Sequence, residues 1–237
     1  MIEVRGLKKS FGPVDALRGI DLRIVPGAVT GVLGPNACGK TTLIKSILGL
    51  VLPDAGEIRI VGHPINRDCE YRGQIGYLPQ SPDFPSNLSI KELFAMMEDV
   101  RGQKAPRREE LIALFGLGDF MNKSFAVLSG GTKQKVSATL AFMFDAPILI
   151  LDEPTVGLDP VAALHLKDLI RKAASGGKCV LMVSHIISEI EQLVSQMIFL
   201  LDGKILCSGP VDDILRRTST DRLDESLVRL MTGKHAR

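Results

Sequence analysis

The segment 34–41 reads GPNACGKT, which has the residue types and spacing of a loop that binds phosphate groups. Gly34 and Gly39 stand where the backbone of such a loop must bend tightly or come close to phosphate oxygens. The backbone N–H groups between them would line an anion site, which the N-terminus of the next helix completes. Lys40 would reach the β- and γ-phosphates of a nucleotide, and the Thr41 hydroxyl could ligate Mg²⁺.

The residues on either side of this loop support the same interpretation. Residues 28–33 (AVTGVL) have the composition of a buried strand, and the apolar residues 43, 44, 47 and 48 fall on one face of a helix. Strand, loop and helix in that order is the context in which such a loop binds phosphate. The alternative is a glycine-rich turn that matches the pattern by chance, and this context disfavours it.

Two carboxylates follow a run of apolar side chains. Residues 148–151 (ILIL) predict a buried strand, and Asp152 and Glu153 come directly after it. In α/β folds, ligands bind at the carboxyl ends of the strands. Asp152 would therefore hold Mg²⁺ through water, and Glu153 would orient and polarise an attacking water as general base. The alternative is a strand that ends in an acidic turn, and the phosphate loop favours the chemical interpretation.

A serine and two glycines form the third group. Ser129, Gly130 and Gly131 precede residues 132–142, which are compatible with a helix. At a helix N-terminus these residues would offer N–H groups to an anion. Alone, LSGG would be an ordinary turn, and its position ahead of the carboxylate strand makes it informative.

These groups need a scaffold that brings distant segments together, and the hydrophobic pattern predicts one. Strand patterns occur at 2–4, 19–25, 28–33, 57–61, 74–78, 148–151, 179–184 and 196–201, with helical patterns between several of them. Such alternation predicts an α/β fold with a parallel sheet covered by helices. Residues 90–144 are mostly helical in pattern, which predicts a helical subdomain inserted into the core.

Composition limits the class of protein. The chain of 237 residues is 45% hydrophobic, which is enough for a full core. Its apolar runs are far shorter than the ~18 residues of a membrane span, and residues 1–10 lack a secretory signal, so we expect a soluble, cytosolic protein. The net charge of +2, without a long basic run, does not favour nucleic acid as a partner. The four cysteines show no C-x-x-C spacing, so neither zinc nor a disulfide framework is expected.

Six motifs in order resemble those of the ATP-binding subunit of ABC transporters, over essentially the full length of the chain. They are GPNACGKTT from Gly34, YLPQ with Gln80, LSGGTKQK from Leu128, ILILDEP from Ile148, GLDP from Gly157 and VSH with His185. The resemblance implies a RecA-like P-loop NTPase core with N-terminal antiparallel β-strands and an inserted helical subdomain. It implies one ABC-type ATPase domain over 1–237, with the core at 1–85 and 146–237 and the subdomain at 86–145.

The resemblance also implies ATP and Mg²⁺ as cofactors and a head-to-tail dimer, either a homodimer or a heterodimer with a related ATPase subunit. In that family the phosphate loop of one subunit and the LSGG helix of the other enclose ATP. The subunit would drive a separately encoded transmembrane permease from the cytoplasmic face of the membrane. YLPQ and GLDP look most like export-type systems, and LSGGTKQKVS also looks like subunits that accompany nitrous-oxide-reductase copper maturation.

Residue roles carry over from the same resemblance. The phosphates would be wrapped by Asn36, Ala37, Cys38, Gly39, Lys40, Thr41 and Thr42. Phe11 would stack on adenine, although it could also be an apolar residue beside a turn at Gly12. Gln80 would link Mg²⁺ and water to the permease, and His185 would hydrogen-bond the γ-phosphate. Ser129, Gly130 and Gly131 would contact the γ-phosphate of the opposite subunit, and Asp159 would line the dimer seam.

Two departures from the family pattern bear on activity. Ala37 and Cys38 replace the usual Gly-Ala or Gly-Ser, and a positive φ at Ala37 would cost about 1–2 kcal/mol. Cys38 is either a reactive thiol in a positive field or a small side chain packed against the sheet. Thr132 replaces the usual glutamine and is expected to weaken contacts with the opposing nucleotide. Because Glu153 is retained, we expect an active ATPase.

Two other functions stay open from the sequence. One is a soluble ABC ATPase of an assembly pathway, like those that serve iron–sulfur clusters. The other is a nucleotide-binding module with little turnover, on account of Ala37 and Thr132. A coiled coil of the kind found in repair and chromosome relatives would not fit between residues 90 and 144, and translation relatives fuse two ATPase domains where this chain has one.

Overall fold

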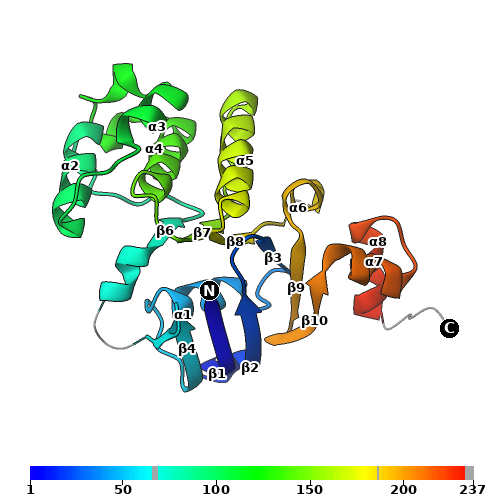
Figure 1. The fold of residues 1–237 in the computed structure, drawn as a ribbon. Helices are drawn as coiled ribbons and strands as arrows, with labels where there is room; N and C mark the ends of the chain where they lie inside the picture. Colours follow the sequence, from blue (N-terminus) through cyan, green and yellow to red (C-terminus); the bar gives the residue numbers. More distant parts are fainter. Residues whose placement is uncertain (66–68, 186, 233–237) are drawn as a thin grey trace.

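The computed structural model describes residues 1–65, 69–185 and 187–232. They form two β-sheets with helices around them (Figure 1). The N-terminal sheet has the order β2-β1-β4-β5 and is antiparallel, with β1 (Ile2–Phe11), β2 (Val14–Ile24), β4 (Ala55–Ile60) and β5 (His63–Pro64). The central sheet has the order β10-β9-β3-β8-β7-β6, with β3 (Val29–Leu33), β6 (Ile75–Leu78), β7 (Ile148–Asp152), β8 (Cys179–Val183), β9 (Gln196–Leu201) and β10 (Lys204–Pro210).

The central sheet is parallel except at one edge. Strands β9, β3, β8, β7 and β6 run in the same direction, and β10 pairs antiparallel with β9. Strands β3, β7 and β8 are buried at every position, which explains their largely apolar sequences, since helices or a second sheet cover both faces. The predicted α/β fold with a parallel sheet and N-terminal antiparallel strands is therefore confirmed.

Side chains alternate between two hydrophobic cores on opposite faces of the central sheet. In β7, Leu149 and Leu151 point into the core shared with the helices, whereas Ile148 and Ile150 point into the core shared with the N-terminal sheet. This is the two-residue period that a strand imposes on its side chains. The two cores thus fix the central sheet from both faces, and they thereby fix the positions of the carboxyl ends of its strands.

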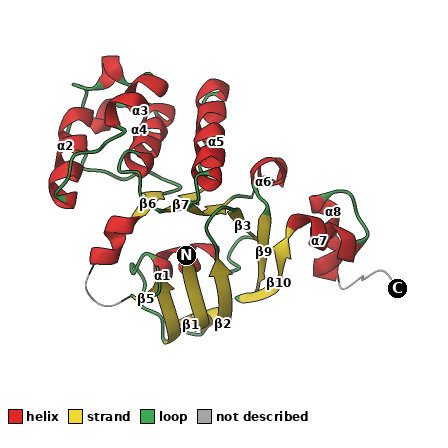
Figure 2. Cartoon of the chain, in the orientation of Figure 1, coloured by secondary structure: helices red, strands yellow, loops and turns green. Residues whose placement is uncertain are grey.

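Helices cover one face of the central sheet, and the N-terminal sheet lies with α1 on the other (Figure 2). The helices are α1 (Lys40–Ile47), α2 (Ile90–Arg101), α3 (Arg108–Leu114), α4 (Gly130–Phe142), α5 (Pro160–Ser175), α6 (Ile187–Leu193), α7 (Val211–Thr218) and α8 (Leu223–Thr232). Short 3₁₀ turns occur at Glu70–Gln74, Gly118–Phe120 and Phe125–Val127. Helices α2, α3 and α4 come between β6 and β7 in the sequence and lie together on one side of the sheet, and we call them the helical layer (Figure 1).

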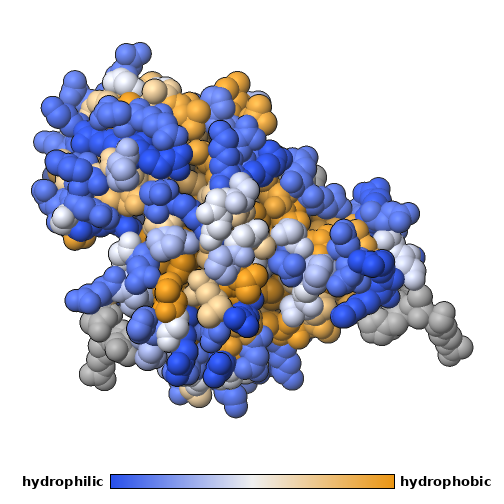
Figure 3. All heavy atoms as spheres, in the orientation of Figure 1, coloured by the Kyte–Doolittle hydropathy of each residue, from blue (hydrophilic) through white to orange (hydrophobic). Residues whose placement is uncertain are grey.

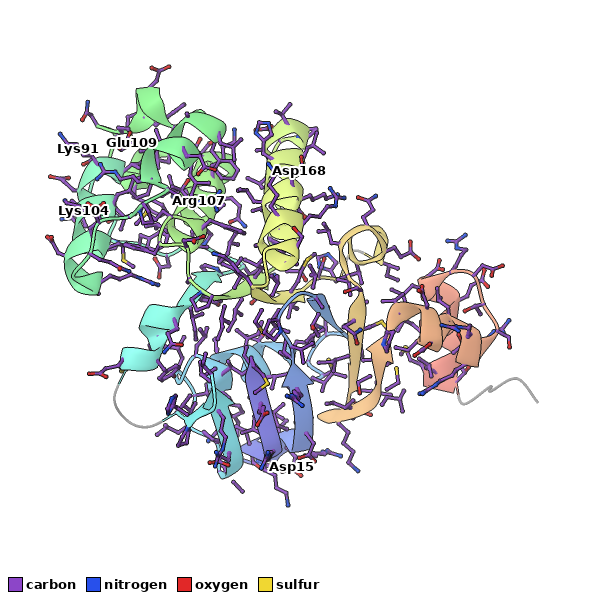
Figure 4. All side chains as sticks on the ribbon, in the orientation of Figure 1. Asp15, Lys91, Lys104, Arg107, Glu109 and Asp168 are labelled. Carbon is purple, nitrogen blue, oxygen red and sulfur yellow. The ribbon has the colours of Figure 1, made fainter. Side chains whose placement is uncertain are left out.

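A buried carboxylate holds part of the helical layer together. Glu98 of α2 is almost completely buried and accepts hydrogen bonds from the Ala105 backbone N–H (3.0 Å), from Lys104 (3.2 Å) and from Arg108 (3.3 Å). The bond from Ala105 and the two cations keep the pKa of Glu98 below its usual range. Lys104 is labelled in Figure 4, on the same side of the molecule as Arg107 and Glu109. These contacts tie the end of α2 to the start of α3.

Candidate functional site

The phosphate loop connects β3 to α1, as the sequence predicts. Neither glycine of the loop could carry a side chain, because a Cβ at Gly34 would lie 2.1 Å from the Leu200 carbonyl oxygen and one at Gly39 would lie 2.5 Å from that of Ala16. Both glycines also have a positive φ. The close approach is thus to the protein's own backbone, from β9 and β2, and these strands shape the loop.

Lys40 points back into the loop. Its ammonium group donates to the carbonyl oxygens of Gly34 (2.6 Å) and Pro35 (2.9 Å), and it stands at the first position of α1. Thr41 is exposed in the first turn of the same helix. The loop therefore has one cation, one exposed hydroxyl residue and a helix N-terminus close together, which is the chemistry that a polyphosphate needs.

The two departures inside the loop have different structural outcomes. Ala37 has φ 62°, which lies in the left-handed region, so this position carries backbone strain. Cys38 is 3% exposed, packs in the core between the two sheets, and receives a hydrogen bond at its carbonyl oxygen from Gly203 N–H (3.1 Å). The structure therefore favours the second of the two alternatives for Cys38, a small side chain packed against the sheet.

Asp152 ends β7, and its side chain is buried. Burial, and then the charge of Glu153, raises the pKa of Asp152 to about 6, while the positive charges of Lys40 and Lys45 oppose the rise. Asp152 thus lies within electrostatic reach of the phosphate loop and the helix after it. A buried carboxylate with a raised pKa gains from a nearby cation, because the cation compensates for the lost hydration.

Glu153 follows in a strained conformation with φ 50°. Its carboxylate is buried and has two partners from the end of β8, since His185 Nδ1 lies 2.7 Å from Oε1 and the Ser184 hydroxyl donates to Oε2 (3.2 Å). Its backbone N–H donates to the Val183 carbonyl oxygen (2.8 Å). Three contacts from one neighbouring strand therefore hold Glu153 in place.

Gln80 lies at the same edge of the central sheet, two residues after the end of β6, and is exposed. Since β3, β8, β7 and β6 are parallel neighbours, the segments that follow them meet at one edge. The structure thus brings together the phosphate loop, His185, the two carboxylates and Gln80.

Phe11 lies at the end of β1, where 51% of its surface is exposed and Lys9 stands 5.4 Å from the ring centroid.

Ser129 and the two glycines lie elsewhere. Ser129 caps α4, with Gly130 and Gly131 in its first turn. The first turns of α4 contact the 154–159 segment, where Gln134 donates to the Pro154 carbonyl oxygen (3.2 Å) and Lys135 pairs with Asp159 (2.6 Å). Within residues 1–65, 69–185 and 187–232, no hydrogen bond or ion pair joins LSGG to the phosphate loop of the same chain.

Asp159 serves α5 directly. Its side chain accepts a hydrogen bond from the Ala162 N–H (2.9 Å) as the helix cap, with Pro160 at the first helical position. The bond from Lys135, and then that from Ala162, lowers the pKa of Asp159. Sequence patterns predicted no role for Lys135 or Ser184. The VSH motif contains Ser184, but nothing in the sequence pairs it with Glu153.

A groove lies beside Gln80, between the helical layer and the central sheet. Its volume is about 430 Å³, and Pro79 and Ser81, the neighbours of Gln80, line it together with Tyr77, Phe84 and Met97. Figure 3 shows apolar residues gathered in the middle of the molecule, below the helical layer. Burial and the charge of Asp152 raise the pKa of Tyr77 to about 12. Arg72, Asp83 and Arg101 add charged groups to the lining.

A helix-to-sheet contact forms one end of the groove. Arg101 of α2 donates to the carbonyl oxygens of Gly73 (2.7 Å) and Ile75 (2.7 Å), and its guanidinium stacks 4.5 Å from the centroid of the Phe144 ring.

No helix in the described part of the chain is long and apolar enough to cross a membrane.

Comparison with known proteins identifies the family. The family model described as "ABC transporter" matches residues 17–156. The daunorubicin resistance ATP-binding protein DrrA3 of Streptomyces coeruleorubidus is 35% identical over 94% of this chain and 72% of its own length. The Nod factor export ATP-binding protein I of Paraburkholderia xenovorans is 32% identical over 88% of this chain and 70% of its own length.

Solved structures agree with the relatives. The ATP-binding subunit of an ABC transporter superposes with a TM-score of 0.92 at 30% identity, over 98% of this chain and 99% of that one. A dimeric ATP-binding cassette in a post-hydrolysis state, bound to ADP and Pi, superposes with a TM-score of 0.77 at 25% identity, over 89% of this chain and 99% of that one. Fold, motif geometry and relatives thus agree that the chain belongs to the ABC transporter family, as an ATP-binding subunit with an ABC ATPase fold.

Proposed function

We propose that this subunit binds ATP with Mg²⁺, hydrolyses it in a dimer, and drives a separately encoded transmembrane permease. One observation carries the proposal. The phosphate loop, the two carboxylates and His185 meet at one edge of the central sheet, and Glu153 is held there by Ser184 and His185. Hydrolysis of a bound nucleotide needs this combination of a phosphate cradle, a metal-side carboxylate and a base.

The residues at this edge fit Mg²⁺. The ion is usually held in proteins by one or two carboxylates together with substrate phosphates, rather than by a full protein cage. Asp152 supplies one buried carboxylate and Thr41 one exposed hydroxyl. When bound, Mg²⁺ would neutralise charge on the transferred phosphate and, as a cation, lower the pKa of Asp152 from its present value of about 6.

Glu153 is assigned the role of general base. Each of its oxygens accepts one hydrogen bond from the protein and has a second lone pair for a water molecule. Glu153 would take a proton from the attacking water. The oxygen of that water would bond to the γ-phosphorus while the bond from this phosphorus to the ADP oxygen breaks. His185 contacts Glu153 through Nδ1, and its other ring nitrogen would face the γ-phosphate; donating to both at once requires the imidazolium, in which each ring nitrogen carries a proton. Phe11 would stack on adenine, since more than half of it is exposed.

The LSGG segment is assigned to the opposite subunit's ATP. Ser129 and Gly130 are exposed and stand on a helix whose first turns contact the 154–159 segment. A head-to-tail dimer would place them over the partner's γ-phosphate, with Asp159 near the seam. A solved relative is a dimer of ATP-binding cassettes bound to ADP and Pi, which supports a dimer for this chain as well. The dimer would be a homodimer, or a heterodimer with a related ATPase subunit.

The groove beside Gln80 is proposed as the docking site for the permease. It is largely apolar, lies next to the residue assigned to couple the two proteins, and spans the junction between the helical layer and the core. Docking there would place the subunit on the cytoplasmic face of the membrane. Export is the direction favoured by the relatives named for Nod factor export and daunorubicin resistance.

The function is tested by changing Glu153 to Gln and measuring nucleotide binding and phosphate release. Loss of a general base is expected to slow release by about 10²–10⁴-fold while ATP binding is retained. Lys40→Ala is expected to weaken binding or turnover, because its charge on the phosphates is lost. Phosphate release by Glu153→Gln at the wild-type rate would show that the base is another group.

Two measurements separate the alternatives from this function. If the wild type releases no phosphate even when membranes from its own cells are added, a nucleotide-binding module is favoured. Co-purification with a polytopic membrane protein supports transport, whereas a soluble partner complex would favour an assembly ATPase.

A further inference from the structure

We infer that Thr132 is a positioning residue that directs the Ser129 hydroxyl proton toward the opposite subunit's nucleotide. The inference rests on the proposed composite site. Thr132 stands where the family usually has glutamine, and the sequence suggests only that a contact is weakened. In the structure, it makes two contacts with Ser129 instead.

Both contacts converge on one oxygen. The Thr132 backbone N–H donates to Ser129 Oγ (3.2 Å), and Thr132 Oγ1 lies 2.8 Å from the same atom. A serine hydroxyl has one proton to donate and two lone pairs that can accept. If both Thr132 groups donate, the lone pairs of Ser129 are filled, and its own proton is left for an acceptor outside the helix.

A second capped helix in the same chain shows the opposite arrangement. At the start of α2, Ser89 Oγ accepts from the Glu92 N–H (3.3 Å) and lies 2.7 Å from Glu92 Oε2. An ionised carboxylate can only accept, so the Ser89 proton is used inside its own helix. The third helical residue therefore decides where the hydroxyl of the cap serine donates its hydrogen bond. Glutamate at this position accepts that hydrogen bond, whereas threonine can donate instead and leave the serine hydroxyl to an acceptor outside the helix.

An anion selects between the two directions open to the Ser129–Thr132 bond. If Ser129 donated to Thr132, its one remaining lone pair would face the phosphate oxygens and repel them. If Thr132 donates, Ser129 presents its proton, next to the N–H groups at the start of α4. Ser129 is exposed and Thr132 half-buried, which suits an outer group that touches the nucleotide and an inner group that orients it.

The test is a double-mutant cycle between Thr132→Val and Ser129→Ala. Each change is made in the full chain carrying Glu153→Gln, so that ATP is bound without turnover. The measured quantity is the Mg-ATP concentration that gives half-maximal dimer by analytical ultracentrifugation. Thr132→Val keeps the shape and removes the hydroxyl, and Thr132→Ser restores it. Thr139→Val is the matched control, because Thr139 lies in the same helix and its hydroxyl donates to the Lys135 carbonyl oxygen (2.9 Å).

Thr132→Val is expected to raise the required ATP concentration by roughly 2- to 10-fold, the worth of one hydrogen bond. Thr132→Ser and Thr139→Val are expected to stay near the parent, and Thr132→Val should have no further effect once Ser129 is Ala. The inference would be overturned if Thr132→Val raised the required ATP concentration equally in the parent and in the Ser129→Ala background. It would also be overturned if Ser129→Ala raised that concentration and Thr132→Val did not. If Ser129→Ala itself left ATP-driven dimerisation unchanged, the composite site would be wrong rather than the role of Thr132.

Discussion

Replacing Asp152 with Asn should stabilise the protein in the absence of nucleotide and Mg²⁺, and the gain should depend on pH. Burial and the neighbouring Glu153 raise the pKa of Asp152 from 3.8 to about 6 in the folded protein. The folded state then binds the proton more tightly than the unfolded state does. The charge on Asp152 therefore lowers stability progressively as the pH rises from about 4 to about 6.

The size of the effect follows from the difference between the two pKa values. A difference of about 2 pH units corresponds to about 3 kcal/mol of unfolding free energy at pH 7 and above. For a chain of this length, about 3 kcal/mol corresponds to a shift of roughly 6–12 °C in the unfolding midpoint. Asn has the same shape and no charge, so the variant lacks this loss.

The assay is thermal unfolding of wild type and Asp152→Asn from pH 4.5 to pH 8, in buffer with a chelator. The difference between the two midpoints should grow up to about pH 6.5 and then stay level. The pH dependence isolates the charge, because any packing effect of Asn is the same at every pH. Asp159→Asn is the control: because Lys135 lowers the pKa of Asp159 below its ordinary 3.8, its charge favours the folded state above that pH. This variant should therefore differ from the wild type by an amount that stays level from pH 4.5 to pH 8, and Asn can still cap α5. A difference for Asp152→Asn that is constant or shrinks with rising pH would refute the reasoning.

Three further predictions concern the loop and the dimer. Ala37→Gly should raise the unfolding free energy by about 1 kcal/mol, because the gain from removing left-handed strain at φ 62° is larger than the loss from a more flexible unfolded chain. A denaturant titration that shows a lower unfolding free energy would contradict this. A maleimide should label the exposed Cys69 before the buried Cys38, as peptide mapping can check, and early labelling of Cys38 would mean that the loop opens. Mixing Lys40→Ala with Ser129→Arg subunits should restore part of the phosphate release, because one composite site per mixed dimer is intact; a structure with both motifs of one chain on the same ATP would rule out that arrangement.

Local patterns predicted the elements that are buried on both sides. The apolar runs at 148–151 and 179–184 correspond to β7 and β8, because strands with both faces covered show continuous apolar sequence. The long hairpin of β1 and β2 was only partly predicted, at 2–4 and 19–25, because one face meets solvent and register shifts interrupt the alternation. Strand β10 was missed for a similar reason, since it alternates exposed and half-buried residues.

The sequence alone determined the fold class, the phosphate loop and the two carboxylates, because these depend on residue type over short, contiguous segments. Only the tertiary structure decided what surrounds them. Strand order brings β3, β8 and β7 side by side, so that Ser184 and His185 reach Glu153 across more than thirty residues of sequence. The tertiary structure also places the carbonyl oxygens of Leu200 and Ala16 so close to Gly34 and Gly39 that neither position has room for a side chain, even without a ligand. Hydrogen bonds and close approaches depend on distances in space, and spacing along the chain does not encode them until the sheet has formed.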